Sequence, residues 1–226
     1  MPVTIETALA QLQDAARPDK AAELAAYHKA SRVYLGTANP DIDAAQKEWR
    51  AELDIEGRVA LASALWASDI HEARIAAAKL LTQARLTPDT LVWALIKSWV
   101  PDFDGWAIAD HACSAGAKRL VADPARIDDV EAWTGSDHMW TRRAALVITL
   151  PWTRQNHPKP KDLEIRDRVL GWAEGYVGDR NWFIQKAVGW WLRDLSKHDP
   201  ARVQAFLAAH GERLKPFARK EAKKYL

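Results

Sequence analysis

The sequence predicts an all-α protein built as an array of antiparallel helices. Three observations support this prediction. Apolar residues recur at helical spacing along the whole chain, and the links between the periodic segments are short. No convincing segment alternates apolar and polar residues as a half-buried strand does. A chain of 226 residues suffices for one domain or one continuous array, so we expect residues 1–226 to form a single domain.

Capping residues and prolines mark the helix starts in order along the chain. Thr4 precedes the first apolar-periodic segment, and Pro18 fits the first turn of the second helix. Pro101 breaks the chain before the helix that carries Trp106, and Pro124 marks the next boundary. After the first helix the sequence predicts helices over 19–31, 41–53, 56–67, 69–84, 88–99, the stretch around Trp106, 125–134, 137–150, 160–177, 180–196, 199–209 and 211–225. Residues 33–35 are apolar but too few to found a sheet.

Several of these segments resemble one another. Residues 73–81, 141–148 and 183–190 each combine a basic residue with small residues and then bulky ones. The spacing from Trp106 to Arg143, and from Arg143 to Lys186, is about 40 residues, the period of HEAT-type repeats. Such repeats stack helix pairs into an α-solenoid, whose concave surface the basic residues would line. A plain helical bundle with alanine-rich helices stays the alternative.

Composition excludes several classes of protein. No apolar run approaches the length of a bilayer span, and the N-terminus lacks the pattern of a secretory signal, so we expect a cytoplasmic protein. The single Cys113 excludes an internal disulfide and a thiolate metal site. His111 and His138 lack metal-ligand spacing, and we expect neither a metal nor a cofactor. The net charge of +2 is weak evidence for nucleic acid, and the basic residues of 213–224 are typical of a solvated helix end.

The most informative pair is Trp106 and Asp110, which lie one helical turn apart with small and apolar residues between them. This spacing places an aromatic ring and a carboxylate on one side of a helix. Most such pairs are a core aromatic beside a solvated carboxylate. With arginines nearby and twelve tryptophans in the chain, the pair also suits a flat cationic ligand on a phosphate backbone.

The arrangement of motifs resembles the AlkD family of bacterial DNA glycosylases, which are built from HEAT-like repeats and excise alkylated purines. The matching segments occur in the same order over nearly the whole chain. They are residues 26–29, 34–36, Trp106-x-x-x-Asp110, 140–145, 183–193 and 219–224. The segment 97–104 departs from the family pattern, which leaves the preferred lesion open.

The resemblance implies the roles of particular residues. In the family, a tryptophan and an aspartate one turn apart share a catalytic cleft with an arginine and a second tryptophan. These roles carry over to Trp106, Asp110, Arg143 and Trp190. Tyr27 carries over as a residue that supports DNA binding.

Three further cations follow from the repeat pattern. Since basic residues would line the concave face, we expect DNA contacts from Arg142, Lys186 and Arg193. The expected partner is double-stranded DNA carrying alkylated purines, and the expected state is a monomer with no membrane association.

The resemblance also implies a mechanism. An alkylated purine is cationic and already a good leaving group, so the enzyme must mainly stabilise the charge that builds on the deoxyribose. Asp110 would supply that stabilisation and orient the attacking water. Two alternatives stay open: a non-catalytic HEAT-repeat DNA-binding protein, and a helical scaffold that binds proteins.

Overall fold

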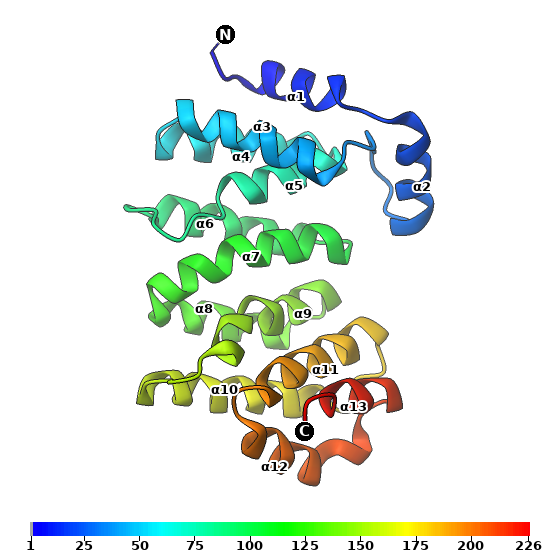
Figure 1. Ribbon diagram of the computed structural model, residues 1–226, viewed down its shortest axis with the longest axis vertical. Coiled ribbons are helices and arrows are strands. Elements are labelled where there is room, and N and C mark those ends of the chain that lie inside the picture. Colours follow the sequence, from blue (N-terminus) through cyan, green and yellow to red (C-terminus); the bar gives the residue numbers. More distant parts are fainter. Residues whose placement is uncertain (1) are drawn as a thin grey trace. The chain divides into compact units, whose positions relative to one another are not determined.

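The computed structural model describes residues 2–226, and these residues form thirteen α-helices joined by short 3-10 segments and links (Figure 1). Within that range the β structure is a single parallel bridge between Val33 and Ile70. The all-α prediction is therefore confirmed. The chain divides into two compact units, Met1–Ala122 and Asp123–Leu226, which are described separately. That residues 1–226 act as a single domain stays a prediction.

Unit 1 holds the first seven α-helices. They are α1 (Ile5–Asp14), α2 (Pro18–His28), α3 (Asn39–Glu52), α4 (Ile55–Ala67), α5 (His71–Leu80), α6 (Thr90–Trp99) and α7 (Trp106–Ala122). α4 packs against α5 and α6 against α7, as consecutive helix pairs. The second helices of these two pairs, α5 and α7, also pack on each other. Repeated pairs with this pattern are the organisation that the sequence period predicts.

Local sequence explains why these helices start and pack where they do. Thr4 caps α1, exchanging hydrogen bonds with Thr7, and the Asp54 carboxylate caps α4 by accepting from the Gly57 amide at 2.8 Å. Small side chains let α5 and α7 approach closely. The fully buried alanines of the two helices are Ala73, Ala76, Ala77, Ala78, Ala109, Ala112 and Ala115.

Unit 2 repeats the scheme. Its α-helices are α8 (Ile127–Glu131), α9 (Met139–Ile148), α10 (Pro160–Tyr176), α11 (Trp182–Ser196), α12 (Pro200–His210) and α13 (Pro216–Ala222). α11 packs on α9 and on α13, so second helices again lie against one another. A Cβ on Gly189 would stand 2.9 Å from the Ala218 carbonyl oxygen, which explains why α11 has glycine where it meets α13.

The predicted helices are present, but several boundaries are wrong, and the helix predicted over 19–31 already ends at His28. The stretch predicted as 125–134 is a 3-10 turn, the short α8 and a second 3-10 turn over Ala132–Gly135. The helix predicted over 69–84 spans only α5, and the last helix begins at Pro216 instead of 211. In the last case a 3-10 turn over Gly211–Arg213 and extended backbone at Leu214 and Lys215 separate α12 from α13. Proline is the first residue of α2, α10, α12 and α13, so it marks a helix start more closely than periodicity does.

Tryptophans form much of the core. Trp49, Trp66, Trp93, Trp152 and Trp172 are buried, whereas Trp133 is half-buried. Of the neighbours Trp190 and Trp191, only Trp191 is fully buried. Among residues 2–226, no helix has the length and apolarity needed to cross a bilayer.

Candidate functional site

The predicted site residues are divided between the two units. Unit 1 holds Trp106 and Asp110 on α7 and Tyr27 on α2. Unit 2 holds the cations and the second tryptophan, namely Arg142 and Arg143 on α9 with Lys186, Trp190 and Arg193 on α11. Apart from Tyr27, all of them lie on the second helices of the pairs.

Trp106 is the first residue of α7, and Asp110 follows one turn later. Gly105 precedes the helix, and its carbonyl oxygen accepts the Ala109 amide at 3.2 Å, so the first turn is regular. Trp106 is 37% exposed and Asp110 is half-buried, whereas Ala107, Ile108 and Ala109 between them are buried. The pair therefore lies at the edge of the core, with both an aromatic surface and a carboxylate within reach of a ligand.

Trp106 belongs to a cluster of five rings, which we call the Trp106 ring cluster: Tyr27, His28, Tyr34, His71 and Trp106. Tyr27 meets Trp106 edge-on, with ring centroids 6.2 Å apart. His28 lies 5.4 Å from Trp106 and 4.7 Å from His71, and its ring is parallel to that of Tyr34 at 6.2 Å. Tyr34 and His71 are 4.8 Å apart. Trp106 thus lies against a connected set of phenol and imidazole rings.

The link between α2 and α3 carries Tyr34 and is tied to the rest of the unit by charged groups. The buried Glu72 carboxylate accepts the Leu35 and Gly36 amides, both at 2.9 Å. The buried guanidinium of Arg32 pairs with Asp69 and, just before α7, with Asp104. Since Asp104 lies two residues before Trp106, Arg32 connects the link directly to the start of α7.

Burial gives His71 an unusual titration. The side chain is only 4% exposed, and in the described structure its Nδ1 has no hydrogen-bond partner. Burial lowers the pKa of His71 from 6.5 to about 3, and the charges of His28, Arg32 and His111 add to the effect. His71 is therefore neutral in the folded protein at any pH near neutrality.

This titration predicts a pH-dependent stability. Below pH 6.5 His71 takes up a proton in the unfolded chain but not in the folded protein. The stability that neutral His71 contributes to the folded state is therefore fully present above pH 6.5 and is lost as the pH falls toward 3. Between pH 7.5 and pH 5 we expect His71 to lower the free energy of unfolding by about 2 kcal/mol. Urea unfolding at both pH values checks this expectation.

The matched variants for that experiment are His71→Phe and His157→Phe. The first keeps a ring beside His28 and Tyr34 and removes the titration, so the loss between the two pH values should shrink by about 2 kcal/mol. His157 is exposed, and its replacement should leave the wild-type difference intact. An unchanged pH dependence in His71→Phe would contradict the assignment.

In unit 2, exposed and half-buried aromatic rings alternate with cations across three helices. Trp140 on α9 packs on Phe183 at 4.6 Å, Phe183 on Trp182 at 5.0 Å, and Trp182 on Phe217 of α13 at 5.7 Å. Lys186 lies 4.8 Å from the Trp182 ring and Arg143 lies 5.7 Å from the Trp140 ring. The Arg143 side chain is 2% exposed. Aromatic rings with interleaved cations suit nucleic acid.

Trp190 and Arg193 share one carboxylate. Trp190 Nε1 donates to Asp194 at 3.3 Å, and Arg193 donates to the same residue through Nε at 3.0 Å. Burial disfavours the charged form of Asp194, but hydrogen bonds from Arg193 and Arg154 outweigh it and hold its pKa below the usual value. Arg193 also binds Glu221 of α13, so the half-buried Trp190 is fixed within a network of charges.

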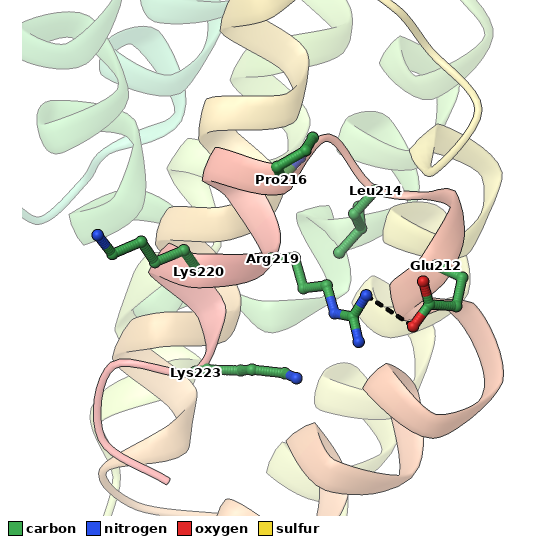
Figure 2. Close-up of a pocket in the computed structure, with 6 residues that line it drawn as sticks. All are labelled: Glu212, Leu214, Pro216, Arg219, Lys220 and Lys223. Carbon is green, nitrogen blue, oxygen red and sulfur yellow. Dashed lines mark ion pairs between the residues drawn. The ribbon is translucent and has the colours of Figure 1, made fainter.

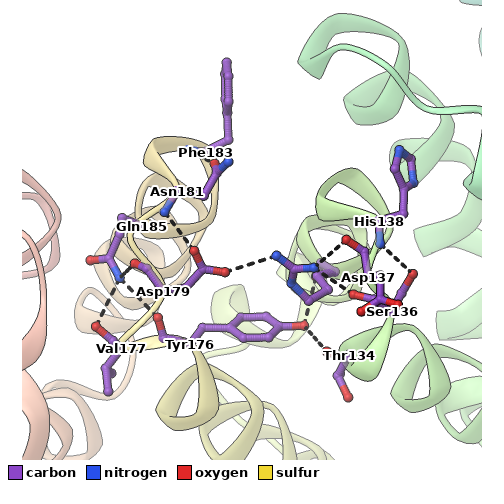
Figure 3. Close-up of polar contacts among 11 residues, drawn as sticks. Thr134, Ser136, Asp137, His138, Tyr176, Val177, Asp179, Asn181, Phe183 and Gln185 are labelled. Atoms are coloured by element: carbon purple, nitrogen blue, oxygen red, sulfur yellow. Dashed lines mark hydrogen bonds and ion pairs between the residues drawn. The ribbon is translucent and has the colours of Figure 1, made fainter.

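Arg142 is engaged in a polar network within unit 2. Its guanidinium donates to the Ser136 and Asp137 carbonyls at 2.7 and 3.0 Å and pairs with Asp179 at 3.2 Å. Figure 3 shows how this network continues through Tyr176 and Asp179 to the fully buried Gln185. Gln185 donates to the carbonyls of Tyr176, Val177 and Asp179 and accepts the Lys215 amide at 2.8 Å.

The basic C-terminal residues line a surface hollow of about 420 Å³ (Figure 2). Its lining is Glu212, Leu214, Pro216, Arg219, Lys220 and Lys223. Arg219 pairs with Glu212 at 2.6 Å, which leaves the two lysines as the uncompensated charges of the hollow. The basic C-terminal segment is therefore more than a solvated helix end, because part of it borders this hollow.

Sequence reasoning missed most of the Trp106 ring cluster. It assigned Tyr27 and Trp106, but it gave no role to His28, Tyr34 or His71. The available signal was weak, since His28 adjoins Tyr27 and an isolated His71 opens a helix with no metal-ligand spacing. In the described part of the chain, no three His, Cys, Asp or Glu side chains gather as a metal site would require.

Helix pairs whose second members pack on one another define a helical-repeat protein, and solved structures share this fold. A predicted DNA alkylation repair enzyme from Enterococcus faecalis is 25% identical with a TM-score of 0.77, over 93% of this chain and 96% of that one. AlkD2 from Streptococcus mutans is 19% identical with a TM-score of 0.66, over 99% of each chain. The smu.31 protein from Streptococcus mutans UA159 is 21% identical with a TM-score of 0.62, over 83% and 92%. The fold is thus the HEAT-like repeat fold of the AlkD proteins.

The sequence itself matches the family described as DNA alkylation repair enzyme over residues 8–226. The chain therefore belongs to the DNA alkylation repair enzyme family, and the resemblance found in its motifs is confirmed. A search of curated proteins gives no significant match. Membership of this family implies DNA as the partner.

Proposed function

We propose that this protein is a monofunctional DNA glycosylase that hydrolyses the N-glycosidic bond of cationic N7- or N3-alkylated purines in duplex DNA. The observation that carries the proposal is the pair on α7: a 37% exposed Trp106 and a half-buried Asp110 one turn later, in a chain of the DNA alkylation repair enzyme family. An aromatic surface beside a carboxylate is the chemistry that a cationic base on a sugar requires.

The chemical step mainly requires stabilisation of the positive charge that develops on the deoxyribose. Alkylation at N7 or N3 makes the purine positive, so the base leaves without needing a strong general acid. As the bond to C1′ lengthens, the deoxyribose acquires oxocarbenium character, as in glycoside hydrolysis. The Asp110 carboxylate stabilises that charge and orients the water that attacks C1′. The products are the free base and an abasic site in an intact strand.

Aromatic rings account for the preference for charged lesions. A cation over the face of Trp gains roughly 0.5–2 kcal/mol, and a neutral base does not. Trp106 supplies this contact in unit 1, with the 68% exposed Tyr27 beside it to hold a phosphate through its hydroxyl. In unit 2 the proposal assigns an aromatic contact with the same DNA to Trp190. The lesion stays stacked in the duplex, which would allow bulky adducts.

We rank the proposed phosphate contacts by whether each basic side chain already pairs with a carboxylate within the protein. Lys186 is exposed on α11, so we assign it the first phosphate contact among the proposed surface cations. Arg142 and Arg193 bind carboxylates within unit 2, and a phosphate would have to displace Asp179, or Asp194 and Glu221. Arg143 is 2% exposed beside Trp140, so the phosphate contact next to the lesion that we assign to it requires its guanidinium to become accessible when DNA binds.

The experiment is release of free base from duplex DNA carrying a single N7-methylguanine, with the uncatalysed rate subtracted. We expect release without strand cleavage, because a lyase needs an amine nucleophile and no lysine is assigned to the site. The hydrolysis needs no cofactor, and a monomer is expected to suffice. Absence of release from both N7-methylguanine and N3-methyladenine duplexes would favour a non-catalytic DNA-binding repeat protein. A scaffold that binds proteins would instead lack the steep salt dependence of duplex affinity.

A further inference from the structure

Helix α2 is attached to unit 1 only lightly along its length. None of its residues, 18–28, is buried, and Figure 1 shows it to one side of α1 and α3. Its first turn is held by backbone, since the Arg17 amide donates to the Leu35 carbonyl at 2.9 Å. Gly36, with φ of 77°, lies so close that a Cβ would stand 2.1 Å from the Arg17 carbonyl oxygen. The other end of α2 depends on Tyr27 and His28.

His28 is the residue that connects this end of α2 to the rest of the Trp106 ring cluster. Its ring contacts all four others, at 5.0 Å from Tyr27, 5.4 Å from Trp106, 4.7 Å from His71 and 6.2 Å from Tyr34. Tyr27, by contrast, is 68% exposed and meets Trp106 only edge-on. The position of Tyr27 at Trp106 therefore follows from where His28 docks.

The surroundings of His28 favour an uncharged ring. Partial burial lowers the pKa of His28; Glu72 on α5 opposes the shift and Arg32 in the following link reinforces it. Burial likewise keeps His71 on α5 neutral and raises the pKa of Tyr34. Asp69 and Asp104 face the cluster through their ion pairs with Arg32. A proton on His28 would thus add a positive charge beside Trp106.

We propose that His28 is a positioning residue for the cationic lesion: as a neutral ring it docks the end of α2 on Trp106 and sets Tyr27 in place, and when protonated it repels the positive base. The inference rests on the proposed function. His28 forms no bond to the substrate in this proposal and acts through Trp106 and Tyr27. Protonation of His28 as the pH falls should therefore weaken binding of a cationic lesion, while the DNA phosphates and the lesion keep their charges.

The experiment compares His28→Ala and His28→Phe with wild type, using duplex DNA carrying N7-methylguanine between pH 7.5 and 5.5. At pH 7.5, His28→Ala should raise the KM roughly 2- to 30-fold, the range of a lost cation–aromatic contact, with a smaller effect on kcat. His28→Phe should keep the wild-type KM, because a phenyl ring fills the same place. Wild-type KM should rise as the pH falls and His28 takes up a proton, and His28→Phe should remove that rise. His157→Phe, an exposed histidine changed in the same way, is the control.

A second readout does not need activity. Amide hydrogen exchange of residues 18–28 at pH 7.5 should be faster in His28→Ala than in wild type, and unchanged in His28→Phe. Equal exchange in all three proteins would overturn the docking role, and a wild-type KM that is constant with pH would overturn the charge role. If wild type releases no base at all, the proposed function fails, while the exchange comparison still decides whether His28 docks α2.

Discussion

Replacing Asp110 by asparagine is expected to slow release of N7-methylguanine from duplex DNA by roughly 100- to 1000-fold, the usual effect of removing one preorganised electrostatic contact. Asparagine keeps the size and much of the hydrogen bonding of the side chain, so binding and folding should change little. It loses the negative charge that the oxocarbenium-like sugar requires. Single-turnover release of free base, measured with enzyme in excess over DNA, isolates this step from product release.

The matched control is Asp14→Asn, which makes the same change at an exposed carboxylate at the end of α1. It should release base at the wild-type rate. Asp110→Asn should bind the methylated duplex with nearly wild-type affinity, because its loss arises in the transition state. If Asp110→Asn excises at the wild-type rate, the assignment of the carboxylate is wrong. If both binding and rate fall together, Asp110 acts in binding instead.

The spacing of Trp106 and Asp110 could be predicted because a helix converts a four-residue interval into one face. The rest of the Trp106 ring cluster could not, since His28, Tyr34 and His71 meet only through the fold of the α2–α3 link. Glu72 and Arg32 fix that link through hydrogen bonds and ion pairs. The sequence does not distinguish these two charged residues from ordinary solvated ones. Long-range contacts of this kind leave no periodic trace.

Buried arginines could not be predicted from the sequence. The repeat pattern predicts basic residues along a binding face, and exposure of Lys186 leaves it accessible for such a role. Other arginines, for which the sequence predicts no role, turn inward to the links between helices. Arg58 donates to the Arg50 and Leu53 carbonyls, and Arg166 to those of Trp152 and Gln155. A guanidinium group can satisfy several carbonyls at once because its donors are fixed in a planar fork, so such links can turn sharply without unsatisfied backbone.

Arg119 is the most buried case in unit 1, and its replacement is expected to have the largest effect on stability. The side chain is 0% exposed and binds the Leu86 carbonyl at 3.1 Å, the Ala84 carbonyl at 3.0 Å, the Gln83 carbonyl and the Asp89 carboxylate at 3.2 Å. Arg119→Ala removes the donor from these carbonyls in the link between α5 and α6 and breaks the ion pair with Asp89. We expect the free energy of unfolding to fall by about 3–5 kcal/mol, as when one partner of a buried ion pair is removed.

Urea unfolding at pH 7.5 measures that loss, with Arg85→Ala as the control. Arg85 is exposed in the same link, so its removal should change the free energy of unfolding by less than about 0.5 kcal/mol. Arg119→Lys should recover only part of the loss, because an ammonium group keeps the charge but lacks the planar fork that reaches several carbonyls. Full recovery by lysine would mean that charge alone stabilises the link. A stability of Arg119→Ala equal to that of Arg85→Ala would mean that water replaces the guanidinium at no cost.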